Sequence, residues 1–212
     1  MTNVLRITTS ILGEGSVSSQ LMDELIAGLR DRDAINLVER DFSKQAIPHL
    51  DGPWLKALST PEADRDGTQQ QQVEYSDSLI AELQHADVLV IGLPMYNFSV
   101  PSMLKAWIDH VARAGVTFKY TENGPVGLLE PKKVYVLAAM GGEHEAGATD
   151  FLRPYMKLIF SFIGLEDVEF VSADGLSMSR ERREQGLRTA RGQIENIVAE
   201  YGAIKAEEEV AA

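Results

Sequence analysis

The chain of 212 residues contains no cysteine. This absence excludes thiol catalysis, disulfide bonds, and zinc or iron–sulfur sites held by cysteine. A chain of this length needs no such cross-link, because it can bury roughly 70% of its unfolded surface. No basic segment followed by a long apolar stretch occurs at the N-terminus, so we find no signal peptide and expect a cytoplasmic protein.

Positive charge is also scarce. Lys and Arg total 20 against 32 Asp and Glu, which gives a formal net charge of −12. Without an excess of cations to neutralise phosphates, we expect no nucleic acid partner and no binding to an anionic membrane surface. The longest apolar run, residues 88–95, is far shorter than the roughly 20 residues that span a bilayer, so we also expect no membrane insertion.

Strand-like and helix-like segments alternate along the chain. Apolar runs predict strands at 3–9, 34–40, 87–93, 133–139 and 168–173. Helical spacing predicts helices at about 18–30, 69–85, 101–115, 151–162 and 187–201. Five strands alternating with five helices favour a parallel sheet covered on both faces. No linker divides the chain, so we predict one domain over 1–205 and a frayed acidic tail at 206–212.

Two segments interrupt this alternation. Residues 41–68 are irregular and rich in Pro and Asp, with a short helix expected at 54–58. Residues 116–129 predict a hairpin whose turn lies at 121–125, where Asn-Gly is a strong turn signal. Both segments are candidates for pocket walls or for contacts between subunits.

Ligands of such sheets bind outside the carboxyl ends of the strands. This places the candidate site in three loops, at 10–18, 94–100 and 140–150. The first loop carries several serines before a helix N-terminus, whose free N–H groups and partial positive charge suit a phosphate. The alternative is a flexible loop with an ordinary serine cap.

Other phosphate motifs fit this loop less well. Residues 13–18 are similar to the dinucleotide fingerprint G-x-G-x-x-G, with serine in place of the last glycine. Gly13 follows the strand too late for the tight turn which that motif requires. No P-loop sequence is present either.

The other two loops have compositions that suit a flat ligand. Pro94 and Pro101 bracket an aromatic, amide-bearing turn, which offers apolar walls and polar groups to a ring system, or else fills the core. Gly141 and Gly142 in the third loop let backbone N–H groups approach a ligand closely, or form only a turn.

Side chains for acid–base, nucleophilic or metal chemistry are hard to assemble from this sequence. None of the four histidines has metal-ligand spacing with another, so we expect no metal site. His144 alone lies beside a candidate loop, and it is either a substrate-pocket residue or a surface histidine. We therefore expect no catalytic side chain, and a bound cofactor that carries the chemistry.

Two segments resemble a known family. Pro94-Met95-Tyr96-Asn97-Phe98 and the downstream stretch 112–125, with sequence ARAGVTFKYTENGP, are similar to the FMN-dependent NADH-azoreductases, which are quinone reductases. The resemblance covers about residues 1–200, and its specific part is 94–128. It implies a flavodoxin-like α/β fold, a three-layer sandwich with a five-stranded parallel sheet in the order 2-1-3-4-5.

The resemblance also implies roles for individual residues. The FMN phosphate would bind Ser10, Ser16, Val17 and Ser18. The flavin ring would lie against Met95, Tyr96, Asn97 and Phe98, with Ala139, Met140, Gly141 and Gly142 at its polar edge. Tyr120 and Phe162 would line the substrate pocket, with His144 as a further candidate.

The implied activity is a two-electron, ping-pong transfer from NADH through FMN to quinones or to azo compounds, whose azo bond is cleaved. The implied assembly is a homodimer with sites at the subunit interface. One departure is that the family's Ser-Arg-Gly-Gly is Ala139-Met140-Gly141-Gly142 in this chain, which can shift substrate or nicotinamide preference. Few basic residues near the loops could hold a 2′-phosphate, which favours NADH over NADPH.

Two alternatives remain open. The first is a flavodoxin-type electron carrier that serves a protein partner, which the acidic net charge would suit. The second is a phosphate-binding regulator that holds no flavin. A carrier would not oxidise NADH directly, and a regulator of this kind would not take up FMN.

Overall fold

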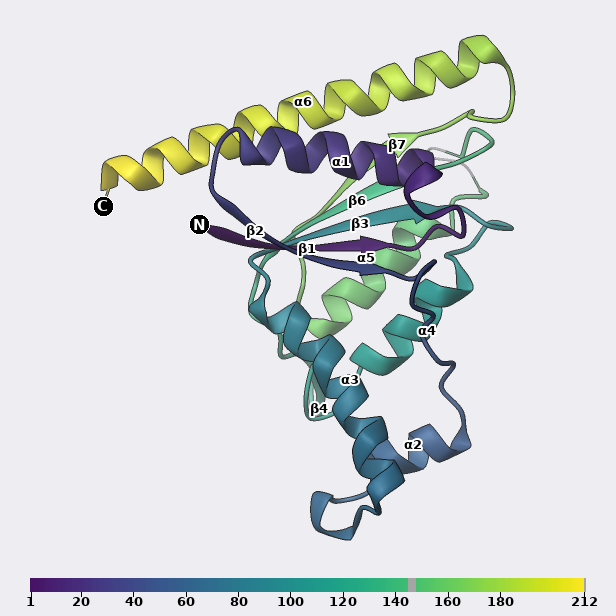
Figure 1. Cartoon of the computed structure of the whole chain (residues 1–212), viewed down its shortest axis with the longest axis vertical. Coiled ribbons are helices and arrows are strands. Elements are labelled where there is room, and N and C mark those ends of the chain that lie inside the picture. The colour runs from purple at the N-terminus through teal and green to yellow at the C-terminus, as the bar shows by residue number, and fades with distance from the viewer. Residues whose placement is uncertain (145–147, 212) are drawn as a thin grey trace.

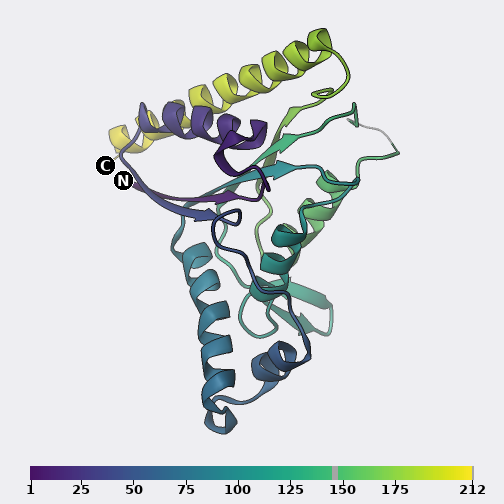
Figure 2. The ribbon, with the colours of Figure 1, turned by 45° about the vertical axis from the view of Figure 1, so that its right-hand side comes forward.

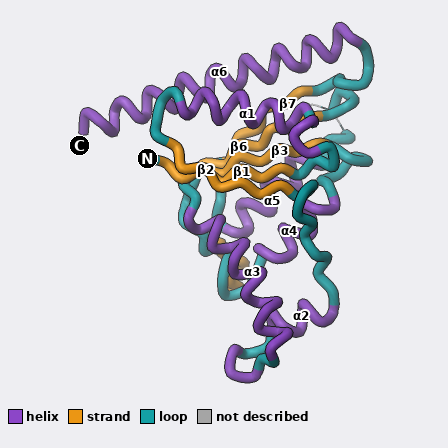
Figure 3. The backbone as a smooth tube through the Cα atoms, in the orientation of Figure 1, coloured by secondary structure: helices purple, strands orange, loops and turns teal. Residues whose placement is uncertain are grey.

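The computed structural model of the chain describes residues 1–144 and 148–211. A five-stranded sheet forms its centre (Figures 1 and 3). The strands are β1 (Thr2–Thr8), β2 (Ile35–Asp41), β3 (Val88–Pro94), β6 (Lys133–Ala139) and β7 (Val168–Ala173). Every neighbouring pair is parallel, and the spatial order is β2-β1-β3-β6-β7. This is the predicted 2-1-3-4-5 order, so the expected α/β sandwich is confirmed.

Helices cover both faces of the sheet and make three layers (Figure 1). The α1 helix (Val17–Arg30) and the α6 helix (Arg180–Ala211) lie on one face. The helices α3 (Gly67–His85), α4 (Ser102–Val111) and α5 (Leu152–Ile163) lie on the other. Two short 3₁₀ turns, Gly13–Gly15 and Glu62–Asp64, precede α1 and α3.

The alternation of side chains along each strand divides the apolar core into two clusters. In β3, Val88 and Val90 face α1 and α6, whereas Leu89 and Ile91 face α3, α4 and α5. This central strand is buried along its whole length, which accounts for its continuous apolar run. The edge strand β2 is partly exposed and alternates in composition instead.

The irregular segment after β2 extends the molecule beyond the sheet. It contains α2 (Gly52–Ser59), capped by the Asp51 carboxylate, which accepts from the Trp54 N–H at 2.9 Å. The Trp54 ring packs edge-on against His110 and Tyr75, with ring centroids 4.6 and 5.6 Å away. The predicted short helix is therefore present, and it docks on α3 at the end far from the sheet (Figure 1).

The predicted hairpin is also present, as β4 (Phe118–Thr121) and β5 (Gly124–Gly127). It packs against the end of α5, where a Cβ atom on Gly127 would lie 2.1 Å from the Gly164 nitrogen. Figure 2 shows the hairpin on the helical side below the sheet, away from the loops at the carboxyl edge.

Two predicted boundaries differ from the structure. The helix predicted to run from Pro101 to Gly115 is α4, which is capped by Pro101 and ends at Val111. It ends early because the Thr117 hydroxyl donates to the Val111 carbonyl at 2.6 Å and accepts from the Arg113 N–H at 2.9 Å. These bonds replace those that another helical turn would make.

The second difference lies at the C-terminus, where the helix predicted over 187–201 is α6 and continues to Ala211. The residues there are mostly Ala, Glu and Lys, which have high helix propensity. Among the residues that the structure describes, no helix combines the length and apolar character needed to cross a membrane.

Candidate functional site

The three predicted loops meet at the carboxyl edge of the sheet. They meet because β3 pairs with both β1 and β6, so the segments after these strands are neighbours. The Ser10 hydroxyl lies 3.1 Å from the Tyr96 hydroxyl, which joins the first loop to the second. The Met95 N–H donates to the Ala139 carbonyl at 3.0 Å, which joins the second loop to the third.

The first loop forms a cradle of buried hydroxyl groups at the N-terminus of α1. Ser16 caps the helix, and its Oγ lies 3.1 Å from Ser18 Oγ and 2.9 Å from Ser19 Oγ. The Ser19 N–H donates to Ser16 Oγ, and the Gln20 N–H to the Ser16 carbonyl. In the described structure the N–H groups of Val17 and Ser18 have no acceptor, because the first N–H groups of a helix have no partner within the helix.

The cradle suits an anion through neutral donors and the helix dipole rather than through cations. The nearby Lys44 ammonium is paired with the Glu14 carboxylate, and this hydrogen bond lowers the pKa of Glu14. The described residues also include no group of three or more acidic or histidine side chains that could hold a metal ion.

The second loop is a tight turn with an unusual backbone. The Tyr96 and Ser99 backbones exchange two hydrogen bonds of 3.0 Å, with Asn97 and Phe98 between them. These two residues have φ values of +50° and +65°, a region that L-residues rarely occupy. Asn tolerates this conformation, but for a bulky Phe it is strained, and such strain concentrates at functional sites.

The turn presents Phe98 to solvent at the mouth of the site. The ring is 53% exposed, and its centroid lies 5.8 Å from that of His144 in an edge-to-face contact. His144 in turn lies within hydrogen-bond distance of Thr149, Nδ1 to Oγ1 2.8 Å. The structure therefore brings His144 into contact with the aromatic turn of the predicted site.

The third loop offers backbone groups rather than side chains. The Gly141 and Gly142 carbonyls accept from the N–H groups of Ser177 and Gly175, at 2.9 Å each. In the described structure their own N–H groups have no protein acceptor and are available to a ligand.

Met140 has a different position from its neighbours. Its side chain is buried in the core cluster beneath α4 and α5, at 1% exposure. Its N–H donates to the Ala173 carbonyl at 2.9 Å, and its carbonyl accepts from the Leu176 N–H at 3.1 Å. The apolar residue thus fits an apolar position, and a methionine there leaves no guanidinium at the rim of the site.

Tyr120 and Phe162 lie together but apart from the three loops. Phe118 joins them, with ring centroids 5.5 Å from Tyr120 and 4.2 Å from Phe162. The twelve-residue α5 helix starts beside the third loop and spans about 18 Å before it reaches this aromatic group. Within one chain, the hairpin and the end of α5 that carry these residues therefore lie away from the loops at the carboxyl edge (Figures 1 and 2).

Several polar residues that hold the site together were not predicted. Thr9 donates from Oγ1 to the Gly92 carbonyl at 2.6 Å and ties the start of the first loop to β3. Ser19 completes the hydroxyl cradle and donates to the Gly13 carbonyl at 2.8 Å. A serine run before a helix was the signal for Ser19, whereas nothing local in the sequence pairs Thr9 with Gly92.

Comparison with known proteins places this fold in a family. A family model described as the flavodoxin-like fold matches residues 2–198. An FMN-dependent NADH:quinone oxidoreductase of Cellvibrio japonicus is 46% identical over 200 residues, covering 94% of this chain and 100% of the relative. A protein of the same description from Alcanivorax borkumensis is 48% identical over 193 residues, covering 91% of this chain and 98% of the relative.

Solved structures agree with this placement. An FMN-dependent NADH-azoreductase from Bacillus anthracis, in complex with FMN, superposes with a TM-score of 0.86 at 25% identity. The match covers 95% of this chain and 100% of that structure. The chain therefore belongs to the flavodoxin-like fold family, and within it to the FMN-dependent NADH:quinone oxidoreductases and azoreductases.

Proposed function

We propose that this protein is an FMN-dependent NADH:quinone oxidoreductase that passes two electrons from NADH to quinones, and to azo compounds by cleavage of the azo bond. The proposal depends on one observation, which is that the first and second loops meet at the carboxyl edge of the sheet. A neutral anion cradle and a rigid aromatic turn are joined there by the contact between the Ser10 and Tyr96 hydroxyls. A ligand with an anionic end and a flat ring, which is the chemistry of FMN, fits this junction.

The residues present fit FMN at each of its parts. Ser10, Ser16, Val17 and Ser18 would hold the phosphate through hydroxyl and backbone donors. Met95, Tyr96, Asn97 and Phe98 would support the ring, because their turn is held by two backbone hydrogen bonds. Ala139, Gly141 and Gly142 would meet its polar edge, and Met140 would contribute its backbone carbonyl alone.

FMN supplies the two-electron chemistry when it is bound. The chain's part is to orient the ring and to stabilise the negative charge that develops on it during reduction. The N–H groups of Gly141 and Gly142 would do so as preorganised donors. No side-chain acid is required, since water can supply protons. One slot above the ring would take the donor and then the acceptor, as a ping-pong mechanism requires.

A homodimer would complete the pocket. Tyr120, Leu158 and Phe151 are 74, 66 and 59% exposed, and they lie on the hairpin and the outer side of α5. Apolar groups exposed along one face suit a protein interface. In such a dimer, Tyr120 and Phe162 of one subunit would lie over the loops of the other, and the sites would lie at the subunit interface.

The proposed function predicts direct oxidation of NADH. Mixing the FMN-loaded protein with NADH in the absence of oxygen should bleach the flavin absorbance near 450 nm, and a quinone should restore it. An electron carrier would bind FMN tightly and remain oxidised in NADH until a partner reductase is added. A protein that takes up no FMN would contradict both functions.

The dimer model predicts a specific effect of Tyr120→Ala. The KM for quinones should change several-fold while FMN content stays at the wild-type level, because the ring would wall the pocket without holding the cofactor. Lys119→Ala is the matched control, since adjacent strand residues point to opposite faces. Unchanged kinetics across several quinones, or a monomer at working concentration in sedimentation, would rule out this arrangement.

A further inference from the structure

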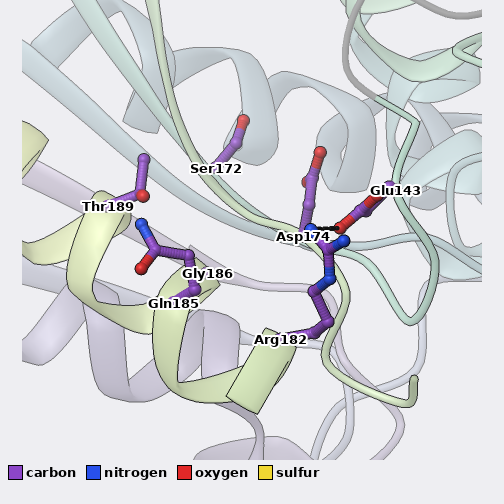
Figure 4. Close-up of a pocket in the computed structure, with 7 residues that line it drawn as sticks. All are labelled: Glu143, Ser172, Asp174, Arg182, Gln185, Gly186 and Thr189. Carbon is purple, nitrogen blue, oxygen red and sulfur yellow. Dashed lines mark ion pairs between the residues drawn. The ribbon is translucent and has the colours of Figure 1, made fainter. Parts of the chain in front are cut away.

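A second cavity opens at the carboxyl edge beside the third loop. It has a volume of about 340 Å³ and is enclosed by the end of β7, the first turns of α6, and the third loop (Figure 4). Its lining is polar and consists of Glu143, Ser172, Asp174, Arg182, Gln185 and Thr189, with Gly186 at the back. The proposed function gives no role to these residues.

The walls of this cavity are held in place by close packing. Gly186 lets α6 approach the end of β7, since a Cβ atom there would lie 2.1 Å from the Asp174 carbonyl oxygen. The Ser172 N–H donates to the Gln193 side chain at 2.9 Å. The Ser172 hydroxyl accepts from the Arg153 guanidinium at 2.6 Å, which leaves the hydroxyl proton for a ligand.

The charge in the cavity disfavours an anion. Among the described residues that line it, Glu143 and Asp174 supply two carboxylates and Arg182 supplies one guanidinium, which is paired with Glu143 at 2.9 Å. The remaining lining groups are two hydroxyls and one amide. A set of acceptors with a net negative charge suits a ligand rich in hydroxyl groups and repels a phosphate.

The cavity and the proposed flavin site share one loop. Glu143 follows Gly142 directly, and the carbonyls of Gly141 and Gly142 are bonded to Ser177 and Gly175, on the segment between β7 and α6. A nicotinamide dinucleotide that lies on the flavin is long enough to reach beyond the flavin site, and this cavity adjoins that site through the third loop. Its hydroxyl-rich parts are the two riboses, and a carboxylate that accepts from a ribose diol is a known means of recognising NAD.

We propose that this cavity binds the adenosine ribose of the nicotinamide donor, with Asp174 and Glu143 as acceptors, and that it favours NADH over NADPH. The inference rests on the proposed function, because it assumes that NADH reduces the bound FMN. Charge supports the preference, since a 2′-phosphate brought to the two carboxylates would be repelled.

The test measures the donor half of the reaction separately. The FMN-loaded enzyme is mixed anaerobically with NADH or NADPH, and the dependence of flavin bleaching on donor concentration gives the dissociation constant. Asp174→Asn should raise this constant for NADH by about tenfold, the loss expected for one hydrogen bond to a charged group. The NADH-to-NADPH preference should fall, and reoxidation by a quinone should keep its wild-type rate.

Two further variants separate binding from folding. Thr189→Leu narrows the cavity from an exposed helix position and should weaken NADH binding without touching the carboxylates. Glu181→Gln, about two turns earlier on α6 and outside the cavity, is the control and should behave as wild type. FMN content and melting temperature are measured for each variant, so that a misfolded protein is recognised.

A readout without turnover identifies which ribose is bound. Calorimetric titration of the oxidised, FMN-loaded protein uses AMP for the adenosine half of the donor and nicotinamide mononucleotide for the other half. AMP should lose affinity in both Asp174→Asn and Thr189→Leu, whereas a loss confined to nicotinamide mononucleotide would overturn the inference. Wild-type donor constants in both variants would overturn the inference, whereas an enzyme that NADH cannot reduce at all would overturn the proposed function instead.

Discussion

At the scale of single residues, the site is defined more by backbone than by reactive side chains. The first and third loops present N–H groups of Val17, Ser18, Gly141 and Gly142, and the second presents a turn with two left-handed residues. A backbone donor costs no side-chain entropy to position, so it is already arranged before the cofactor arrives. A site that relies on backbone donors can accept Ala139 and Met140 where the resemblance leads us to expect Ser and Arg.

Because the Phe98 backbone is left-handed, we expect a glycine variant at this position to be more stable than an alanine variant, which is the reverse of the usual order. At most positions glycine destabilises a protein relative to alanine, but at φ +65° alanine is strained and glycine is not. Phe98→Ala should therefore be less stable than Phe98→Gly by about 1 kcal/mol. Urea unfolding of the two variants after removal of FMN would show it, and a more stable alanine variant would mean that the turn relaxes.

At the scale of secondary-structure elements, the position of the hairpin depends on its contact with the end of α5. The hairpin is held to α5 by backbone contact at Gly127 and by the Leu129 N–H, which donates to the Ile163 carbonyl at 3.1 Å. This contact sets where Tyr120 and the β4 strand lie. Any change that separates the two backbones should displace the aromatic group as one unit.

Gly127→Ala tests this attachment. The added methyl would lie 2.1 Å from the Gly164 nitrogen, and backbone cannot move aside as a flexible side chain can. We expect the free energy of unfolding to fall by about 2 kcal/mol or more. The control is Gly192→Ala in α6, where a Cβ atom meets nothing within 4 Å, and which should gain about 0.5–1 kcal/mol. Equal effects from the two changes would contradict the close contact.

At the scale of the whole molecule, stability depends on groups far from the site. His110 is completely buried between α2 and α3, with Nε2 2.9 Å from the Pro48 carbonyl oxygen. Burial lowers the pKa of His110, although the Pro48 carbonyl and the nearby Asp109 act in the opposite direction. The folded protein therefore holds this histidine neutral at a pH where the unfolded chain binds a proton.

The sign of the pH dependence follows from this difference. The unfolded histidine titrates at about pH 6.5, so the stabilising effect is complete above that pH and is lost as the pH falls below it. Chemical unfolding between pH 5 and 7.5 should show stability that rises with pH. In His110→Gln this part of the slope should disappear, whatever the absolute stability, and the exposed His85→Gln control should retain it. A slope that survives in His110→Gln would assign it to other groups.

A second contribution to the pH dependence of stability comes from Asp33, which lies near the N-terminus and the C-terminal part of α6. A hydrogen bond from the Thr2 hydroxyl lowers the pKa of Asp33, with further support from Tyr201, the N-terminal amine and Lys205. Stability from a carboxylate of this kind is present above its unfolded pKa of about 3.9 and is lost as the pH falls through its lower folded value. Acid unfolding should therefore continue below the range of His110.

The sequence by itself determined the layered fold and predicted where the candidate site lies. The uninterrupted apolar run at 88–93, flanked by helical patterns, requires a strand buried on both faces, and burial on both faces requires the parallel α/β arrangement. The three loops followed from that arrangement, because parallel strands all end at one edge. Short motifs such as Pro94–Phe98 added the family and its cofactor.

Tertiary structure decided everything that depends on contacts between distant segments. Strand periodicity past residue 139 turned the Met140 side chain into the core, and the length of α5 separated Phe162 from the loops. The cavity beside Asp174 exists only where α6 crosses the end of β7, held by Gly186. Sequence patterns report which face of an element is buried, whereas the direction of a loop and the approach of two backbones depend on packing across the whole chain.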